Sequence, residues 1–391
     1  MGKSIYTYYK ERLIEIGGNN KCLYLKSIVR KSAYDIGRIF EGRDGKVAEF
    51  VDFLFTARKY PLTLIANDEK KEILENLDIQ SKLDKKLKDV SALDPEEQKK
   101  ATQKNDKIRK EEAAHAMEVE IGKIKELKRE IEDIERETGR YELYIGYPFV
   151  FGSIQQGPKR TMIKAPLLLF PVKIELPDEN TAEIRFNEAE KVRINTALIF
   201  AYAQSKKLNI DNLELEFDDL SAFRSVKAVA EYLAGYHIRI DCSHSKNVYN
   251  YDRFKEPDGR GGLSVRYAAV LARFPLSNSI YNDYSLLEKK KLTNDPIDEL
   301  LTPQNRRNGW FFRRKPAKKT HDENSYNVRM LDYAQSEVVH KVARNGNMVI
   351  YGPPGTGKSQ TIVNIITDAI CKKKKVLVVS QKKAALDVVY N

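Results

Sequence analysis

The residues whose types and spacing could carry chemistry gather late in the chain, in "GPPGTGKS" at residues 352–359. This stretch fits the spacing glycine, any four residues, glycine, lysine, serine, which is typical of a loop that wraps around phosphate groups. Gly355 and Gly357 allow the backbone to turn with its N–H groups inward, so that they form a nest for phosphate oxygens. The ammonium of Lys358 can reach the β- and γ-phosphates, and the hydroxyl of Ser359 can ligate Mg²⁺. The sequence therefore predicts a site for ATP and Mg²⁺.

The flanks of this loop supply the strand and the helix that such a motif needs. "NMVIY" at 347–351 is a short β-type run, and "SQTIVNIITDAI" at 359–370 predicts a helix with Ile362, Ile365, Ile366 and Ala369 on one side. The N-terminus of that helix presents its dipole and its unsatisfied N–H groups to the same anion. We expect the nucleotide to contact the whole loop and the next residue: Gly352, Pro353, Pro354, Gly355, Thr356, Gly357, Lys358, Ser359 and Gln360.

Segments on either side of this unit extend the predicted site. Gln335, in "LDYAQSEVV" at 331–339, offers one donor and one acceptor in its amide, which suits the edge of an adenine. Beyond the helix, "VLVV" at 376–379 is a continuous apolar run, as the central strands of parallel sheets are. Ser380 ends that run and is expected to cap a further helix.

The length, net charge, cysteine count and longest apolar run limit the class of protein. The chain has 391 residues, enough for two or three domains, and a formal net charge of +12 at pH 7. So basic a balance favours nucleic acid as partner, with a lysine-rich surface that serves only solubility as the alternative. Three widely spaced cysteines disfavour a disulfide framework and fit a reducing cytoplasm. The run "APLLLFPV" at 165–172 is far shorter than the ~20 residues of a membrane helix, so we expect a cytoplasmic protein without a membrane partner.

Two parts precede the β-rich region. Residues 1–66 are expected to be mainly helical, with a helix over "VAEFVDFLF" at 47–55 and a short strand in "YPLTLIA" at 60–66. Residues 67–139 are dense in charge, and we expect two long helices packed as an antiparallel coiled-coil arm. The arm is either an intramolecular hairpin or a docking site for a protein partner. Its apolar stripe has three- and four-residue steps: Met117, Ile121, Ile124, Leu127, Ile131 and Ile134.

Residues 140–300 predict an α+β domain with a mostly antiparallel sheet. Helices are expected at 194–206 and 219–235. Pro148, Pro166 and Pro171 fall inside strand-like runs, which indicates strand edges or bulges there. The runs that predict strands are "YELYIGYPFVFG" at 141–152, "TMIKAPLLLFPVKIEL" at 161–176, "AEIRFN" at 182–187, "HIRID" at 237–241 and "SVRYAAVLARFPL" at 264–276.

The composition shifts at residues 301–325, where seven Arg or Lys lie beside Trp310, Phe311 and Phe312. Cations with interleaved aromatic rings suit a nucleic-acid strand, but a polar run with proline is also typical of a linker between domains, and we favour the linker. Cys242 and His244 stand close together without a second pair of ligands, which is weak support for a metal site.

Three segments, taken in order, resemble a known family. "LDYAQSEVV", "GPPGTGKSQTIVNII" and "VLVVSQKKAALDVV" resemble the Q motif, motif I and motif Ia of superfamily 1 DNA/RNA helicases, most closely the senataxin-like 5′-to-3′ branch. Residues 137–150, 165–172 and 277–287 are similar to the N-terminal region of large bacterial helicase-like proteins. The resemblance implies that residues 326–391 begin a RecA-like α/β lobe and that Gln335 binds adenine. It also implies that Ser380, with Lys382 or Lys383, contacts the backbone of a single-stranded nucleic acid.

The same resemblance implies parts that the printed sequence lacks, namely the acidic pair of motif II, the catalytic arginines and a second lobe. We therefore expect an N-terminal fragment of a helicase or translocase that binds ATP·Mg²⁺ but does not turn it over alone, since phosphoryl transfer depends on those groups. The alternative is a protein-interaction or nucleic-acid-binding module whose phosphate loop is vestigial or completed in trans. A P-loop kinase is a weaker third possibility, because it leaves Gln335 and residues 380–387 without a role.

Overall fold

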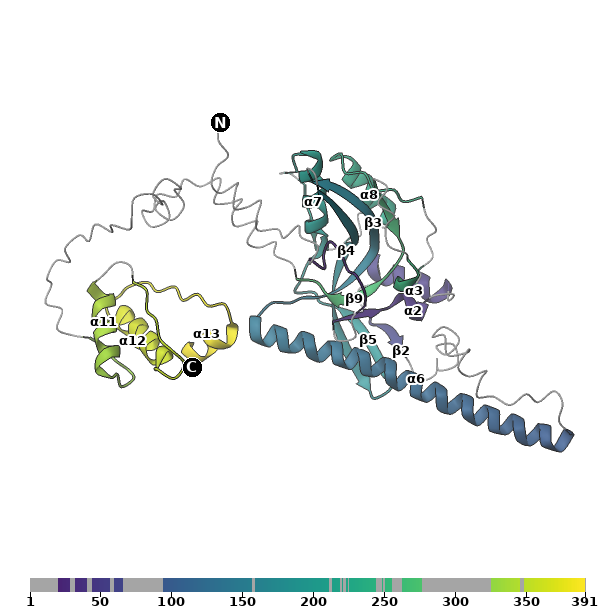
Figure 1. The fold of residues 1–391 in the computed structure, drawn as a ribbon, viewed down its shortest axis with the longest axis horizontal. Helices are drawn as coiled ribbons and strands as arrows, with labels where there is room; N and C mark the ends of the chain where they lie inside the picture. The colour runs from purple at the N-terminus through teal and green to yellow at the C-terminus, as the bar shows by residue number, and fades with distance from the viewer. Residues whose placement is uncertain are drawn as a thin grey trace. The chain divides into compact units, whose positions relative to one another are not determined.

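The structure of the protein is a computed structural model, and the described residues fall in two compact units (Figure 1). The first unit is drawn from Met1–Glu132 and Tyr141–Lys291, and the second from Asp133–Arg140 and Leu292–Asn391. The structure describes residues 20–28, 32–40, 44–56, 60–65, 94–156, 159–210, 213–218, 220, 223, 225–243, 248, 250–254, 262–275, 325–344 and 348–390. Residues 1–19 of the N-terminal part, the first helix of the arm and the basic segment around Trp310 lie outside these residues.

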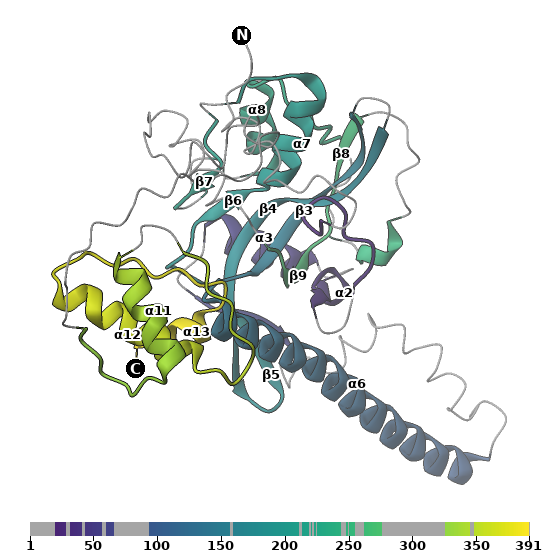
Figure 2. The ribbon, with the colours of Figure 1, turned by 60° about the vertical axis from the view of Figure 1, so that its left-hand side comes forward.

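The first unit is built on an antiparallel sheet of nine strands in the order β1-β9-β3-β4-β5-β2, with β8 beside β3, β6 beside β4 and β7 beside β6. The long hairpin of β3 and β4 runs through its centre (Figure 2). The strands are β1 (Ala33–Asp35), β2 (Leu62–Ile65), β3 (Leu143–Gln156), β4 (Lys159–Asp178), β5 (Thr181–Phe186), β6 (Val192–Ile194), β7 (Glu216–Phe217), β8 (Gly262–Arg266) and β9 (Val270–Arg273).

The apolar runs that predicted strands form the centre of this sheet. Leu167, Leu168, Leu169 and Phe170 of β4 are all fully buried, so both faces of the strand are covered. A strand covered on both faces reads as a continuous apolar run rather than as an alternating one. The predicted α+β class with an antiparallel sheet is confirmed for this unit.

The prediction that the three prolines mark edges or bulges was wrong, since β3 and β4 are central strands without a register shift between them. β4 pairs with β6 at Leu168–Leu169 and with β5 from Val172 onward, so Pro171 lies where the neighbouring strand changes. The backbone N–H that Pro171 lacks costs little at such a point, because no neighbouring strand offers a carbonyl oxygen for it. The carbonyl of Pro171 still accepts a hydrogen bond from the backbone N–H of Asn187 at 3.0 Å.

The segment "HIRID" was also wrongly predicted to be a strand. His237 has a left-handed backbone (φ 64°), and residues 238–240 then run to a single bridge between Asp241 and Ser264. Ile238 is fully buried. The apolar residues of this segment therefore anchor a loop and do not add a strand.

Helices pack around the sheet. They form in segments whose apolar residues recur at steps of three and four. The helices of the first unit are α2 (Gly37–Phe40), α3 (Asp44–Phe55), α6 (Pro95–Thr138, of which the residues up to Glu132 belong to this unit), α7 (Thr196–Lys206), α8 (Val226–Ala234) and the 3₁₀ turn η2 (Tyr251–Arg253). Asn195 and Ser225 cap α7 and α8, because their side chains accept the backbone N–H of Leu198 and Ala228. The predicted helices at 47–55, 194–206 and 219–235 are confirmed, the last in shorter form.

The helix α6 departs from the expected coiled-coil arm. Met117, Ile121, Ile124, Leu127 and Ile131 belong to the same buried cluster as the residues of the sheet. The stripe on α6 therefore packs into the core of the first unit, and over the described residues no second helix runs along it. Periodicity showed that one face of the helix is buried, but it could not distinguish a sheet from a second helix as the partner.

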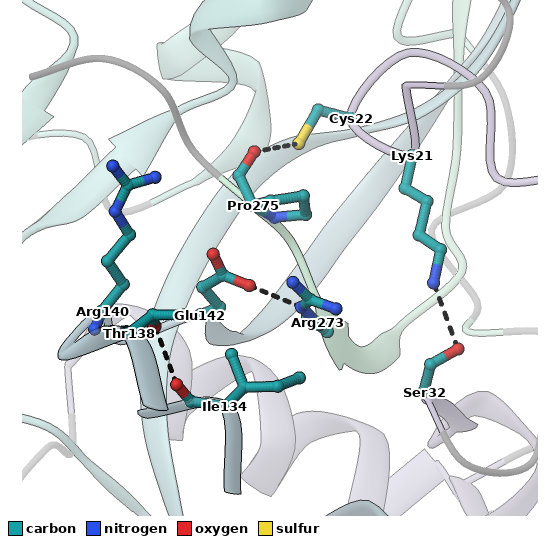
Figure 3. Close-up of polar contacts among 9 residues, drawn as sticks. All are labelled: Lys21, Cys22, Ser32, Ile134, Thr138, Arg140, Glu142, Arg273 and Pro275. Carbon is teal, nitrogen blue, oxygen red and sulfur yellow. Dashed lines mark hydrogen bonds and ion pairs between the residues drawn. The ribbon is translucent and has the colours of Figure 1, made fainter. Parts of the chain in front are cut away.

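Polar contacts also connect segments of the first unit that lie far apart in the sequence (Figure 3). The carboxylate of Glu142, before β3, pairs with the guanidinium of Arg273 in β9. The thiol of Cys22 donates to the carbonyl of Pro275, and burial raises the pKa of that thiol to about 12. All three cysteines, the other two being Cys242 and Cys371, are free thiols, as their spacing predicted.

The second unit consists of α11 (Tyr333–Arg344), α12 (Lys358–Cys371) and α13 (Lys383–Tyr390). The strands expected at 347–351 and 376–379 are not present, since residues 348–353 and 374–380 form no ladder. Val349, Leu377 and Val379 are 75–87% exposed. A strand needs a hydrogen-bonded neighbour, and neither segment has one among the described residues. Within the part of the chain that the structure describes, no helix is long and apolar enough to cross a membrane.

Candidate nucleotide-binding site

The loop at 352–359, hereafter the phosphate loop, turns through two glycines with left-handed backbones. Gly355 has φ 83° and Gly357 has φ 68°, a region that other residues enter only at a cost. Gly357 directly precedes α12 and no side chain caps this helix there. The first N–H groups of α12 are therefore left for an anion, which is the arrangement that binds phosphate at a helix N-terminus.

Gly357 is favoured by its backbone angle, and the absence of a Cβ also lets the side chain of Gln335 come close. A Cβ atom at this position would lie 2.4 Å from Nε2 of Gln335 and 3.0 Å from Oε1 of Gln360. Any side chain would push Gln335 away from the loop. The glycine in the motif thus permits the contact between the loop and α11.

Lys358 lies across the phosphate loop. Its ammonium donates a hydrogen bond to the carbonyl of Gly352 at 2.5 Å, which links the last part of the loop to its first residue. The hydroxyl of Thr356 donates to the carbonyl of Pro353 at 2.8 Å. These two bonds hold the loop in a closed turn, with the lysine ammonium against the carbonyl of the first loop residue.

Gln335 reaches the phosphate loop from the first turn of α11. Its Nε2 donates to the carbonyl of Thr356 at 3.1 Å, while its Oε1 accepts the backbone N–H of Asp332 at 3.1 Å. Asp332 in turn accepts the backbone N–H of Gln335 at 2.7 Å, so the pair forms a reciprocal cap on α11. Both ends of the amide are therefore engaged, and an adenine would have to displace at least one of these bonds.

The contacts that fix this geometry come from α12, on a face that the sequence pattern did not identify. Asn364 is fully buried, accepts the backbone N–H of Val328 (2.8 Å) and Arg329 (3.1 Å), and donates to the carbonyl of Arg329 (3.1 Å). Asp368 accepts the backbone N–H of Tyr326 at 3.2 Å and the ammonium of Lys372 at 2.9 Å. The segment at 326–329, ahead of α11, is thus held against α12 by side chains.

The helix is confirmed, but the side that carries the isoleucines is not its most buried side. The buried positions of α12 are Thr361, Asn364 and Asp368, whereas Ile362 is exposed and Ile365 and Ile366 are half-buried. Buried polar groups demand hydrogen-bond partners, and the backbone at 326–329 supplies them. Polar residues at steps of three and four were the available signal, but the isoleucines on the other side obscured it.

The remaining predicted residues are exposed. Ser359 is the second residue of α12, and its side chain is open to solvent. Ser380, Lys382 and Lys383 are also exposed. Ser380 does not cap α13 as predicted, since its hydroxyl accepts the N–H of Lys382 at 3.4 Å in a turn ahead of the helix.

No group of three or more His, Cys, Asp or Glu that could hold a metal ion is found among the described residues. His244, the partner of Cys242 in the weakly supported metal site, lies outside them. A Mg²⁺ ion at the phosphate loop would therefore depend on Ser359 and on phosphate oxygens of the nucleotide itself, as is usual for this kind of loop.

Comparison with known proteins agrees with a nucleotide site in this part of the chain. Residues 330–391 match the model of an AAA domain. This match spans Gln335, the phosphate loop and Lys383, and it supports nucleotide binding at the level of the domain. Residues 12–200 match a second family model, described as a protein of unknown function (DUF4011). The first unit therefore has relatives but no activity assigned to it by them.

Two curated relatives are similar to more of the chain. The uncharacterized ATP-dependent helicase MG140 homolog of Mycoplasma pneumoniae is 29% identical over 265 residues, which is 66% of this chain and 22% of the relative. The uncharacterized ATP-dependent helicase MG140 of Mycoplasma genitalium is 28% identical over 264 residues, with the same shares. The chain thus spans about a fifth of the length of these relatives. No solved structure matches it.

Proposed function

We propose that residues 325–390 bind ATP·Mg²⁺ as the beginning of the motor domain of an ATP-dependent nucleic-acid helicase or translocase. In this proposal the backbone of the phosphate loop and Lys358 hold the β- and γ-phosphates, and Ser359 ligates Mg²⁺. Gln335 exchanges its bond to Thr356 for the edge of the adenine. The first unit is the accessory part that selects the nucleic acid or a protein partner.

One observation carries the proposal: Gln335 contacts the phosphate loop through Thr356, although 21 residues separate them in sequence. A glycine turn that merely connects a segment to a helix has no need of such a contact. A nucleotide site does need it, because the base and the phosphates of one ligand must be bound from the same side. The match of residues 330–391 to an AAA domain supports the same assignment.

The test is calorimetric titration of the full chain with ATP·Mg²⁺. We expect binding that Lys358→Ala weakens by at least tenfold, because a charge-assisted bond to phosphate is lost. Lys375→Ala is the matched control, since Lys375 is an exposed lysine of the same unit outside the loop. Equal affinity in the parent and both variants, or no binding by the parent, would refute a functional phosphate loop.

Helicase action as a whole requires groups that the printed sequence does not carry. After Ser380 the only acidic residue is Asp387, so no acidic pair is present to complete a Mg²⁺ site. We therefore propose that this chain binds ATP without appreciable turnover. The exposed Ser380, Lys382 and Lys383 are proposed to touch the backbone of a single strand in a longer protein, where ATP turnover would be stimulated by DNA or RNA.

A further inference from the structure

A cavity of about 830 Å³ opens in the first unit, far in sequence from the phosphate loop. Its walls come from the hairpin ends of β3 and β4, from α7 and α8, and from the loop that leads to β8. Helices α7 and α8 lie beside this end of the sheet (Figure 2). The volume falls within the roughly 300–1,000 Å³ that is usual for small-molecule sites.

Three cations from three different elements line this cavity. Arg160 comes from β4, Lys206 from the last turn of α7, and Arg239 from the loop after α8. The Nε–H of Arg160 donates to the hydroxyl of Ser153 at 2.9 Å, which orients the guanidinium and leaves its terminal N–H groups for a ligand. Separate elements have thus brought like charges to one cavity, where they repel one another unless an anion is present.

The carboxylates that would neutralise these cations are scarce. Asp241 is the one acidic residue of the lining, and its oxygens accept the backbone N–H and the hydroxyl of Ser243 at 2.9 Å and 3.1 Å. Within the part of the chain that the structure describes, the side chains of Lys206 and Arg239 form no ion pair. The cavity therefore has an excess of positive charge.

Besides the polar Ser153, Gln155 and Ser205, the rest of the lining is mainly apolar or aromatic. Ile154 and Leu263 are buried in the wall, Ile240 is half-buried, and the ring of Tyr202 stands beside them from α7. Ala230 and Ala234 of α8 are small, so this side of the cavity stays open. A ligand that matches such a surface has an anionic end for the cations and a flat, largely apolar body for the aromatic and aliphatic wall.

We propose that this cavity binds a phosphorylated nucleoside, either a free nucleotide or the 5′-phosphorylated end of a nucleic-acid strand. Arg160, Lys206 and Arg239 hold the phosphate, and the base lies against Tyr202 and Ile240. Neither source involves a covalent step, so the site is a binding site only. The proposal does not rest on the phosphate loop, because the two sites share no residue.

The test uses the full chain carrying Lys358→Ala, so that the phosphate loop does not contribute. Three probes are titrated: AMP, a 5′-phosphorylated single-stranded oligonucleotide, and the same oligonucleotide with a 5′-hydroxyl. Binding of AMP identifies the free nucleotide as the source, and preference for the 5′-phosphate over the 5′-hydroxyl identifies the strand end. Affinity should fall as salt is added, since charge pairs are screened.

Three substitutions separate the cavity from general surface charge. Arg239→Gln removes a cation and should weaken binding about tenfold. Ala234→Trp leaves every charge in place but fills the open side of the cavity, and should also weaken it. Lys227→Gln removes an exposed lysine of α8 that does not line the cavity, and should leave affinity unchanged.

The outcomes are distinguishable from a folding defect, because Arg239 is exposed and its substitution should leave the circular dichroism melting curve unchanged. The proposal is overturned if none of the probes binds in the millimolar range. It is equally overturned if Ala234→Trp binds like its parent, if Lys227→Gln weakens binding as much as Arg239→Gln, or if only oligonucleotides bind, regardless of the 5′ group.

Discussion

At the scale of single residues, the carboxyl group of Asp35 in β1 shows how burial couples the fold to pH. Burial raises its pKa to about 7, although the backbone N–H of Tyr251 donates to it at 2.8 Å and Arg38 opposes the shift. The folded state therefore retains a proton between about pH 4 and pH 7 that the unfolded state releases. Stability from this group is full below the unfolded value of 3.8 and is lost as the pH rises through 7.

We expect the free energy of unfolding to fall by about 3 kcal/mol from pH 5 to pH 8 through this residue. Urea unfolding at the two pH values measures it, and Asp35→Asn, which cannot ionise, is the comparison. The difference between the two pH values should shrink in the variant by that amount. The same pH dependence in both proteins would show that Asp35 already carries its charge at pH 5.

Residue types at fixed spacing predicted the central parts of the candidate site, and geometry decided the rest. Lys358 and Gln335 were predicted to share one site because only a few side chains can serve phosphate or adenine; the structure brings both to one loop, and their contacts with a nucleotide stay a prediction. Asn364 was not predicted as part of the site, because its role depends on hydrogen bonds to the backbone at Val328 and Arg329, which lie 36 and 35 residues away in the sequence. A buried side-chain amide that hydrogen-bonds to the backbone belongs to no recognisable sequence motif.

At the scale of elements, the partner of a helix was harder to predict than the helix. The apolar stripe of α6 showed which face is buried, and the buried cluster shows that the sheet covers it. The strands β3 and β4 were predictable because strands covered on both faces need long apolar runs. The edge positions inferred from Pro166 and Pro171 failed, because a proline in β4 is tolerated where its neighbouring strand changes.

The position of α6 leads to a test of that element. Leu127 is fully buried, and Leu127→Ala should lower the free energy of unfolding by about 2–5 kcal/mol, since a cavity opens between the helix and the core. Lys125→Ala, an exposed neighbour on the same helix, should change it little. Chemical denaturation of the two variants measures both. A cost near zero for Leu127→Ala would contradict the packing of α6 against the core of the first unit.

At the scale of the whole molecule, the described residues form two units with different degrees of completeness. The first has a continuous core from Cys22 to Phe274, whereas the second exposes apolar side chains on 349–351 and 376–379. Composition alone predicted strands at those two segments, because it is typical of buried parallel strands. Whether such a run forms a strand depends on neighbours, and the chain spans only about a fifth of the length of its curated relatives.

This division into units leads to a prediction for hydrogen exchange. ATP·Mg²⁺ should slow amide exchange at Gly355–Gln360, since phosphate oxygens accept those N–H groups, while β1 and β9, which do not line the cavity of the first unit, keep their rates. Mass spectrometry of peptides from the full chain, with and without nucleotide, measures both regions in one experiment. Lys358→Ala should abolish the slowing in the loop. Unchanged exchange at Gly355–Gln360 in the parent, or slowing there that persists in Lys358→Ala, would contradict nucleotide binding by the phosphate loop.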